Sequence, residues 1–407
     1  MITVAKVKFS PNEAQKVLLE KHFGACRFVY NRFLEERDKY YISHRDAEKS
    51  SLSYLDTQGM LVDLKKQFPW LYEINSQSLQ MSLRFLDNAF EAFFRKNADH
   101  PKFRKKGDND YFAVPQHVKI KGNRIYFPKF GEGIYFRGSE EKLAEIRKIK
   151  EIIITKDAGD YYCSIIYDDG EKLPEKVSLS AENAVGIDLG IEKFATLSNG
   201  LAIANPGPIK KAEKKIKRLQ RQLSLKKKGS KNRKKQRIRL QRKYKELRDK
   251  REDFLDNVST AIAKRYDTVI VEDLNVQGMM RNHLAKAITD ASWYAFKQEL
   301  KWKAEKYGKN LVKIGRFDPS SKLCSRCGSV KHDLTLSDRA YRCDACGLTI
   351  DRDLNAAINI LNIGSIKVGL VRPDWPVEIA TSGLHGLYPY GQMSVVEVGS
   401  SEASAEE

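Results

Sequence analysis

The sequence has no uninterrupted run of about 18 apolar residues, the length that a membrane-spanning helix requires. Its first residues, Met1-Ile2-Thr3-Val4-Ala5-Lys6, lack the apolar core of a secretory signal peptide. Cysteine is scarce, with six residues among 407, so a disulfide framework is not expected. These absences exclude an integral membrane protein and a small disulfide-rich secreted protein. We therefore expect a soluble, cytoplasmic protein with no membrane partner.

Acidic residues are outnumbered, because 53 Asp and Glu face 73 Lys and Arg and leave a net charge of +20. The imbalance is concentrated between Lys210 and Arg251, where 22 Lys and Arg accompany three acids. Apolar residues recur there at helical spacing, which predicts two helices broken near Gly229-Ser230 that bury one face. A solvated helical face is the simplest reading of the charge. Contacts to nucleic-acid phosphates explain it better, since charge of one sign is otherwise destabilising.

The length of the chain favours two or three domains over a single core. An alternating apolar pattern at residues 5–9 predicts an opening strand. Ser10-Pro11-Asn12-Glu13 has the features of a capping box, so a helix should begin there and end at Gly24. Further helices are expected at residues 26–37 and 77–96. Together these residues predict a helical domain of about 100 residues.

Between residues 111 and 169 the apolar pattern changes to a period of two, which is typical of strands. The opening strand should complete this β domain, so the helical domain would be inserted into it. The individual strands are expected at residues 118–120, 125–127, 151–155 and 161–166.

Residues 185–191 form a short apolar run with one carboxylate, Asp188, near its end. A buried strand of this kind can present the carboxylate to a divalent cation, with Gly186 and Gly190 allowing close approach. Taken alone, an Asp before a glycine turn is more often a turn residue or a helix cap. A hairpin through Asn199-Gly200 follows, and after the basic helices Thr268-Val269-Ile270-Val271-Glu272-Asp273 predicts another buried strand that ends in acid. This order of strands matches RNase H-like folds.

Four cysteines form two C-x-x-C pairs separated by fifteen residues. This spacing is typical of a zinc ribbon, in which four thiolates complete a tetrahedral, structural site. A redox-active dithiol is the alternative. Cys26 and Cys163 lie in apolar patterns and should be core residues. The candidate zinc ligands are Cys324, Cys327, Cys343 and Cys346.

Directly after the cysteines comes Asp351-Arg352-Asp353-Leu354-Asn355-Ala356-Ala357. An Asp at the start of a helix caps it and interacts favourably with the helix dipole. Both a cap and a metal ligand can be present, because one carboxylate could cap while the other faces a metal ion.

Together these motifs resemble TnpB, the transposon-encoded RNA-guided nucleases related to type V CRISPR effectors. The resemblance extends from about residue 5 to residue 361 and is carried by residues 9–15, 28–31, 186–190, 271–274, 319–324 and 351–357. It implies an α+β multidomain fold. The implied domains are a β-barrel-like wedge domain (1–9 and 111–178), a helical recognition domain (10–110), an RNase H-like RuvC nuclease domain (179–319 and 351–363), an inserted zinc ribbon (320–350) and a flexible tail (364–407).

The resemblance also assigns roles to single residues. Asp188, Glu272 and Asp353 match the three RuvC carboxylates that hold two Mg²⁺ ions, with Asp351 in reserve for the third. Mg²⁺ suits such a site because it prefers oxygen ligands. Arg352 and Asn355 match positions near the scissile phosphate.

The partners implied are a guide RNA from the transposon end and a double-stranded DNA target, bound beside a short adjacent motif. We expect a single protein chain per complex, acting at the prokaryotic nucleoid. Gln80 is polar within an otherwise apolar helix and is the candidate for contacting a base edge. The other candidates for nucleic-acid contact are Arg104, Lys105, Lys226, Lys227, Lys228, Arg233, Lys234, Arg237 and Arg352.

Two other functions remain open. A nuclease-silent, guide-dependent repressor would bind DNA without cutting it, and a DDE-type transposase would share the RNase H fold. The presence of all three acids argues against the repressor. A ribbon between the second and third acids, together with a basic segment suited to RNA, argues against the transposase.

Overall fold

The structure is a computed structural model whose chain divides into two compact units, Met1–Lys172 with Lys211–Arg248 and Leu173–Lys210 with Asp249–Glu407. No helix in the described part of the chain is both long and apolar enough to cross a lipid bilayer. The residues described are 1–370, apart from 48, 108–109, 139–142, 144–145, 147, 206–207, 275–291, 317 and 336–337.

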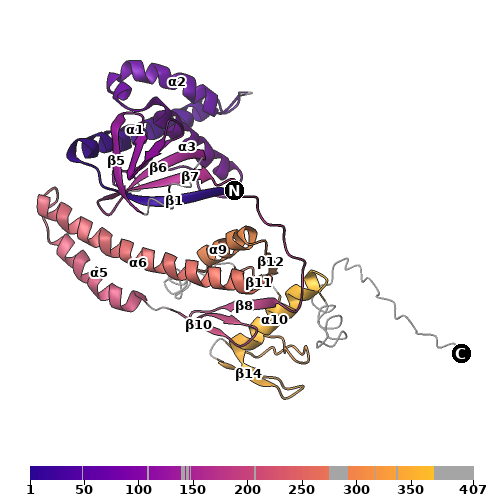
Figure 1. Cartoon of the computed structure of the whole chain (residues 1–407). Helices are drawn as coiled ribbons and strands as arrows, with labels where there is room; N and C mark the ends of the chain where they lie inside the picture. The colour runs from indigo at the N-terminus through magenta and orange to yellow at the C-terminus, as the bar shows by residue number, and fades with distance from the viewer. Residues whose placement is uncertain are drawn as a thin grey trace. The chain divides into compact units, whose positions relative to one another are not determined.

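The first unit contains an antiparallel sheet of seven strands in the order β2-β6-β7-β1-β5-β4-β3 (Figure 1). The predicted opening strand is present and pairs with β7 along its length and with β5 at Lys8 and Phe9. The chain therefore returns to the same sheet after the helices that follow β1, as the alternating patterns predicted. The strands are β1 (Ile2–Phe9), β2 (Tyr111–Val114), β3 (Lys119–Lys121), β4 (Arg124–Phe127), β5 (Phe130–Arg137), β6 (Lys148–Asp157) and β7 (Asp160–Asp168).

Helices between β1 and β2 pack on this sheet, and their buried side chains share one hydrophobic core with it. In α3, the predicted helical repeat buries Leu79, Leu83 and Leu86 completely. The helices in this segment are α1 (Glu13–Ser43), α2 (Tyr54–Gln67), the short 3-10 helix η1 (Pro69–Glu73) and α3 (Ser76–Phe94).

Two predictions about the first helix are wrong in detail. The N-cap is Asn12 rather than Ser10, and its side chain exchanges hydrogen bonds with Gln15 in a complete capping box. The helix also continues through Gly24, where it was expected to end. A glycine inside a helix costs only about 1 kcal/mol. Burial of the neighbouring Phe23 and of the residues on the same face outweighs that cost.

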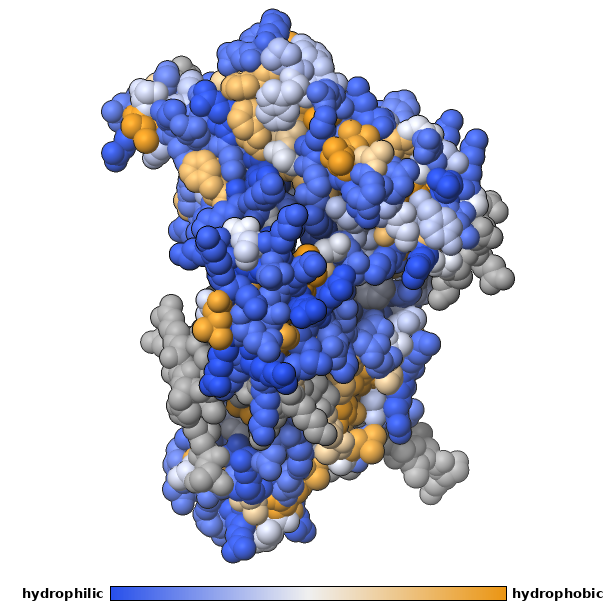
Figure 2. All heavy atoms as spheres, turned by 90° about the vertical axis from the view of Figure 1, so that its left-hand side faces the viewer, coloured by the Kyte–Doolittle hydropathy of each residue, from blue (hydrophilic) through white to orange (hydrophobic). Residues whose placement is uncertain are grey.

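The basic segment forms two helices, α5 (Pro208–Ser224) and α6 (Lys231–Arg265), with the break at Gly229-Ser230 that the sequence predicted. One side of α6 docks on the turn between β6 and β7, where Arg248 forms an ion pair with Asp157. Figure 2 shows a largely hydrophilic surface over the exposed end of this helical pair. The prediction that the pair docks by one side is confirmed.

The second unit contains a mixed sheet of five strands in the order β10-β9-β8-β11-β12. The first three strands are antiparallel, whereas β11 runs parallel to both β8 and β12. The predicted strand of Asp188, the hairpin through Asn199-Gly200 and the strand ending at Glu272 are all confirmed. The strands are β8 (Ala184–Leu189), β9 (Lys193–Leu197), β10 (Ala202–Ala204), β11 (Thr268–Glu272) and β12 (Asn310–Ile314).

Helices cover both faces of the five-stranded sheet (Figure 1). On one face, Val185 and Ile187 of β8 share a core with α6 and with α9 (Trp293–Lys306). On the other face, Ile270 of β11 packs with side chains from α10 (Arg352–Lys367). Alternate residues of β8 and β11 therefore face α9 and α10 in turn.

The helix α10 approaches β8 closely at Gly186. A Cβ atom on Gly186 would lie 2.2 Å from the backbone oxygen of Ala357 and 2.5 Å from the backbone nitrogen of Leu361. Both are backbone atoms of a helix and cannot move aside independently. The prediction that Gly186 permits a close approach is confirmed, and the contact fixes α10 against the strand that carries Asp188.

We expect Gly186→Ala to lower the free energy of unfolding by about 3 kcal/mol, because the added methyl group overpacks this contact. Gly24→Ala is the matched control: among described atoms, none outside its own helix neighbourhood lies within 4 Å of the new Cβ. Alanine is the better helix former by about 1 kcal/mol, so the control should gain stability. Urea unfolding followed by circular dichroism measures both changes. A Gly186→Ala protein as stable as the wild type would contradict the close contact.

A small two-stranded ribbon, β13 (Ala340–Arg342) with β14 (Thr349–Asp351), precedes α10. Its core is formed by Tyr341 and the four paired cysteines. Because α10 continues to Lys367, the first residues of the tail predicted from residue 364 belong to this helix. From residue 371 the predicted tail lies outside the described residues.

Candidate metal centres

Asp188 and Glu272 lie at the same end of two neighbouring parallel strands. Ile187 on β8 pairs with Val271 on β11, so the acidic residues that follow them are level with each other. Ile187 and Val271 point into the core on the α9 side of the sheet. Because side chains alternate along a strand, Asp188 and Glu272 both project from the side that α10 covers.

Asp353 reaches the same edge of the sheet from the first turn of α10. It precedes Ala357 by four residues, or about 6 Å along the helix. Asp188 lies two residues beyond Gly186, or about 7 Å along the strand. Since Gly186 and Ala357 are in contact, these equal advances bring Asp353 level with Asp188. Repulsion from Asp353 acts on the Asp188 carboxylate, as expected of neighbours.

Both strand-borne acids bind protons unusually tightly. Burial, together with repulsion from Asp353 and Glu272, raises the pKa of Asp188 to about 7. Burial also raises the pKa of Glu272 to about 7, against a hydrogen bond from Ser320 that acts to lower it. Ordinary carboxyl groups titrate near about pH 4. Crowded, buried carboxylates of this kind fit a site whose negative charge a hard divalent cation would balance.

Asp351 has a different role from Asp353. Its carboxylate caps α10 by accepting hydrogen bonds from the backbone nitrogens of Asp353 (3.0 Å) and Leu354 (3.1 Å). Its second oxygen accepts a hydrogen bond from Lys193 at 2.9 Å. Of the two acids in this motif, one was expected to cap and the other to face a metal ion. Asp351 is the cap, which leaves Asp353 as the acid beside Asp188.

The raised pKa values predict a pH dependence of stability in protein without divalent metal. The unfolded chain ionises Asp188 and Glu272 near about pH 4, whereas the folded protein keeps both protons up to about pH 7. Their contribution to stability therefore falls as the pH rises from 4 to 7 and stays low above 7. We expect Mg²⁺ to raise the melting temperature more at pH 8 than at pH 5.5.

Calorimetry on an Asp188→Asn, Glu272→Gln variant provides the control, because groups elsewhere titrate equally in both proteins. The variant should lose both the decline in stability between pH 5.5 and 8 and the response to Mg²⁺. A wild-type protein and a variant with superimposable pH profiles would show that these two carboxyl groups are not buried together.

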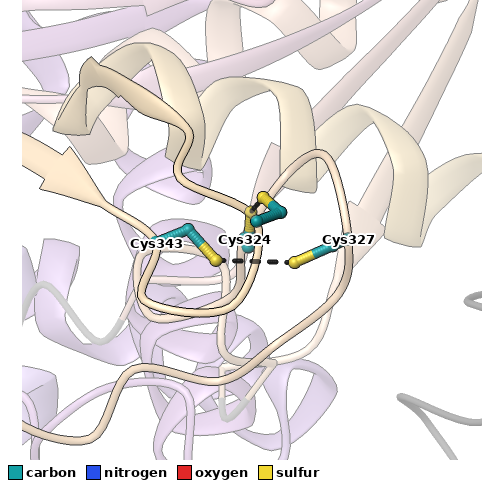
Figure 3. Close-up of side chains that lie close together, drawn as sticks. Cys324, Cys327 and Cys343 are labelled. Atoms are coloured by element: carbon teal, nitrogen blue, oxygen red, sulfur yellow. Dashed lines mark hydrogen bonds between the residues drawn. The ribbon is translucent and has the colours of Figure 1, made fainter.

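The four paired cysteines form a second centre, in which all four sulfur atoms lie within 4.8 Å of one another. Figure 3 shows Cys324, Cys327 and Cys343 pointing toward a common point. Each pair lies on a tight turn that is closed by a glycine nitrogen, Gly328 on the oxygen of Cys324 and Gly347 on the oxygen of Cys343. Both glycines have positive φ angles, as the predicted knuckles require.

The sulfur spacing fits a tetrahedral metal ion. The Sγ atoms of Cys324 and Cys346 are 3.7 Å apart, and those of Cys327 and Cys343 are 3.4 Å apart. Zinc–sulfur bonds of about 2.3 Å in a tetrahedron place sulfur atoms about 3.8 Å apart, whereas a disulfide requires about 2 Å. The closest sulfur pairs combine one cysteine from each knuckle, which does not suit a C-x-x-C dithiol. Cys26 and Cys163 are buried core residues, as predicted.

The carboxylates differ from this compact cluster. Within the described residues, the cysteines are the one group of three or more potential ligands whose atoms all lie within 4.8 Å. Asp188, Glu272 and Asp353 are therefore more widely spaced than the ligands of a closed cage. Such spacing suits a site in which water and substrate oxygen atoms complete the coordination.

Most of the basic residues predicted to contact nucleic acid are exposed. Three lie in the connection between α5 and α6, and two more follow on α6. Gln80 is half-buried on α3. The exposed residues are Lys105, Lys226, Lys227, Lys228, Lys234 and Arg237.

Arg104 and Arg233 instead have partners within the chain. The guanidinium carbon of Arg104 lies 3.6 Å from the centroid of the Tyr30 ring. Arg233 donates hydrogen bonds to the backbone oxygens of Leu223 and Lys226, both at 2.8 Å, and so satisfies the end of α5. These contacts occupy both side chains, and the prediction that they bind nucleic acid is not supported.

The expectation for Asn355 is wrong. Its side-chain nitrogen donates to the backbone oxygen of Leu323 at 2.7 Å, and its oxygen accepts from the backbone nitrogen of Ser325 at 3.0 Å. Asn355 is fully buried, so both ends of its amide serve the ribbon rather than a phosphate. Arg352 remains near the carboxylates, with its Nε atom 3.9 Å from Oδ1 of Asp353.

Two buried residues beside Glu272 had no signal in the sequence. The ammonium group of Lys297, on α9, lies 3.6 Å from Oδ1 of Asp273. Ser320 hydrogen-bonds to the Glu272 carboxylate. Buried lysines are rare and follow no local pattern. A single serine in a loop likewise carries no chemical signature before the fold is known.

Three parts of the chain match known families. Residues 1–46 match a helix-turn-helix domain (HTH_OrfB_IS605), residues 169–283 match a family described as "Probable transposase" (OrfB_IS605), and residues 293–360 match a Cas12f1-like TNB domain. Over residues 1–46 the structure has a strand and one long helix rather than two short helices.

Whole-chain relatives agree with these matches. A protein of Streptomyces pristinaespiralis named "Putative RNA-guided DNA endonuclease" is 36% identical over 365 residues, with 88% of each chain covered. A protein of Escherichia coli (strain K12) whose name begins with the same words is 33% identical, covering 88% of this chain and 91% of the relative.

Among solved structures, the Cas12f1-sgRNA-target DNA complex matches with a TM-score of 0.53 at 14% identity. The match covers 86% of this chain and 83% of the other. At this identity the likeness concerns the fold alone, and the two proteins share a mixed α/β architecture.

Proposed function

This chain belongs to the family of TnpB-like proteins, and on that premise we propose that it is an RNA-guided DNA endonuclease of a transposon. It would use a guide RNA from the transposon end to bind double-stranded DNA beside a short motif, and then hydrolyse phosphodiester bonds. The observation that carries this proposal is the meeting of Asp188, Glu272 and Asp353 at one edge of a sheet. We place the complex in the prokaryotic cytoplasm at the nucleoid, with one protein chain per guide.

We assign the five-stranded sheet, with its helices, to an RNase H-like RuvC nuclease domain. Three antiparallel strands followed by two parallel strands support this assignment. By the same reasoning, the seven-stranded sheet would be the wedge domain and α1 to α3 the recognition domain. Residues 320–350 would be the inserted zinc ribbon.

The three carboxylates would hold two Mg²⁺ ions, which suit a ligand set made only of oxygen. When bound, such ions supply Lewis-acid stabilisation of the phosphate and a more acidic water. Asp188 and Glu272 hold their positions from rigid strand ends, and Asp353 is held by the contact of α10 with Gly186. Arg352, beside Asp353, would balance charge on the phosphate that is cut.

The cysteine cluster would hold one Zn²⁺ ion. Four thiolates complete its tetrahedral set, so no position remains for substrate, and the site would be structural rather than catalytic.

Guide RNA or its hybrid with DNA would lie along the exposed lysines and arginines of the α5–α6 pair. Gln80 would contact a base edge in the adjacent motif.

Replacing Lys227, Lys234 and Arg237 together by alanine should weaken RNA binding about tenfold or more at physiological salt. Each lost phosphate contact releases fewer counterions, so the plot of log affinity against log salt should become about 2 units shallower. Arg233→Ala is the control, since its side chain closes α5 and should leave the slope unchanged. Fluorescence anisotropy at four salt concentrations provides both quantities. An unaltered slope in the triple variant would remove this surface as the RNA site.

A nuclease-silent repressor remains the second candidate, and the presence of all three acids argues against it. A DDE-type transposase is the third candidate, and the ribbon between the second and third acids argues against that function.

The test begins with protein purified together with transcripts of its transposon end, whose bound RNA is sequenced. The complex is then incubated with plasmids that carry a guide-matched site beside a randomised flank. We expect Mg²⁺-dependent cutting of matched plasmids with a restricted set of flanks. A defined bound RNA without cutting would favour the repressor, and the absence of any defined RNA would favour the transposase.

A further inference from the structure

The loop that leads into the ribbon, residues 318–325, contacts both elements that carry the carboxylates. It begins just after β12, whose last residue, Ile314, is level with Glu272. The hydroxyl of Ser320 in this loop hydrogen-bonds to the Glu272 carboxylate. The loop ends in the first cysteine knuckle, at Cys324.

Two asparagines of α10 hold the other side of this leading loop. Asn355 binds the backbone on both sides of Cys324, through the oxygen of Leu323 at 2.7 Å and the nitrogen of Ser325 at 3.0 Å. Asn359 donates to the oxygen of Leu323 at 2.6 Å and to that of Ser320 at 2.7 Å. Both asparagines are completely buried.

These contacts form a short path between the two metal centres. Asn355 and Asn359 are four residues apart and so project from one face of α10. Asp353 lies two residues before Asn355, in the first turn of the same helix. The same loop therefore reaches Glu272 through Ser320 and the helix of Asp353 through the two asparagines. In Figure 3 this helix runs directly behind the cysteine knuckles.

We propose that Asn355 and Asn359 are positioning residues that couple the cysteine cluster to the carboxylate site. A metal ion held by the cysteines fixes the leading loop, and the loop in turn holds Glu272 and Asp353 at their working separation. The metal ion at the cysteines would then support divalent-cation binding at carboxylates that it does not touch. This inference rests on the proposed function, since it assumes that the carboxylates bind Mg²⁺.

A physical reason for strong coupling is that a buried amide cannot lose its partners cheaply. If the loop moves, each asparagine leaves polar atoms unpaired in the core, which costs about 1–3 kcal/mol per group. The loop and the helix should therefore move together. Residues that orient metal ligands from outside the ligand set typically change metal affinity by about 10- to 100-fold.

The test measures Mn²⁺ binding to the full-length, RNA-free protein by electron paramagnetic resonance, with Asp188→Asn defining the signal from the carboxylates. Co²⁺ at the cysteines is followed separately by its thiolate absorption. We expect Asn355→Ala to weaken Mn²⁺ binding by about 10- to 100-fold while the Co²⁺ absorption is retained. Ser365→Ala, on the same helix, is the control, because its buried hydroxyl has no hydrogen-bond partner among the described residues. It should leave Mn²⁺ affinity within about twofold of the wild type.

Removal of zinc from the wild type by a chelator should weaken Mn²⁺ binding by a similar factor. In Asn355→Ala the same treatment should add little, because the path is already broken. This lack of additivity is not expected of general destabilisation. If Asn355→Ala also loses the Co²⁺ absorption, Asn359→Ala, which holds the loop at Ser320, decides by the same criteria.

Wild-type Mn²⁺ affinity in an asparagine variant that keeps its Co²⁺ absorption would overturn the coupling and leave the proposed function intact. Failure of the wild type itself to bind Mn²⁺ through Asp188 would instead overturn the proposed function.

Discussion

Asp353→Asn is expected to slow DNA cleavage by about a thousandfold or more, whereas Asp351→Asn should keep the rate within about tenfold of the wild type. Loss of one carboxylate that holds the catalytic ions removes several kcal/mol of transition-state stabilisation, and each 1.4 kcal/mol is about tenfold in rate. Asparagine caps a helix as well as aspartate does, so Asp351→Asn retains the cap on α10. The two substitutions are chemically identical and lie two residues apart.

Asp188→Asn and Glu272→Gln should resemble Asp353→Asn, because all three acids meet at one edge of the sheet. None of the three should release target DNA, since guide pairing and backbone contacts hold it. Cleavage time courses on end-labelled, guide-matched DNA and gel shifts on the same DNA measure the two effects. An inactive Asp351→Asn protein beside an active Asp353→Asn protein would reverse the assignment of the third carboxylate.

Cys343→Ser is expected to reduce bound zinc from one ion per chain to nearly none and to unfold the ribbon. A tetrahedral thiolate site contributes about 10–16 kcal/mol of binding free energy in small zinc domains, and there it is inseparable from folding. In this ribbon, the core consists of little more than Tyr341 and the cysteines themselves. Without the ion, few apolar contacts would remain to hold residues 320–350.

Zinc content by atomic absorption and limited proteolysis together check this outcome, and new cleavage sites should appear within the ribbon. Cys26→Ala is the control, because that thiol is buried in the core of the first unit and outside the cluster. It should retain a full equivalent of zinc. A Cys343→Ser protein that also retains a full equivalent would show that the cluster is not a zinc site.

The strands that carry Asp188 and Glu272 were predictable because each is a short buried run with a single acid at its end. Such a run is uncommon outside a sheet interior, so its local pattern identifies the strand and its useful residue together. The cysteine centre was equally predictable, because knuckle geometry requires the spacing seen in the sequence. Both features depend on residues that are close together along the chain.

Other elements were hidden by residues with weak or misleading local preferences. The strand β5 contains Gly131 and Gly133, which are poor strand formers, and no alternation marks it as a strand. Gly24 misled in the opposite direction, since burial on both sides carries α1 through it. In both cases tertiary packing decides the outcome, and packing partners lie far away in sequence.

The roles of single polar residues were the least predictable part of the site. Arg104 and Lys105 are adjacent basic residues, yet one packs on Tyr30 and the other is exposed. Asn355 stands in a motif associated with phosphate, yet its amide is used on both sides by the ribbon. A motif identifies a residue type at a position, but the partner of that residue depends on which loop the fold brings beside it.

Anomalous scattering from crystals soaked in Mn²⁺ tests the meeting of the three acids most directly, because Mn²⁺ takes the same oxygen ligands as Mg²⁺. We predict Mn²⁺ peaks within about 2–3 Å of carboxylate oxygens of Asp188, Glu272 and Asp353, with Asp351 still bound to the start of α10. Peaks at Asp351 or at other surface acids, with none between Asp188 and Glu272, would contradict a shared metal site and with it the nuclease function.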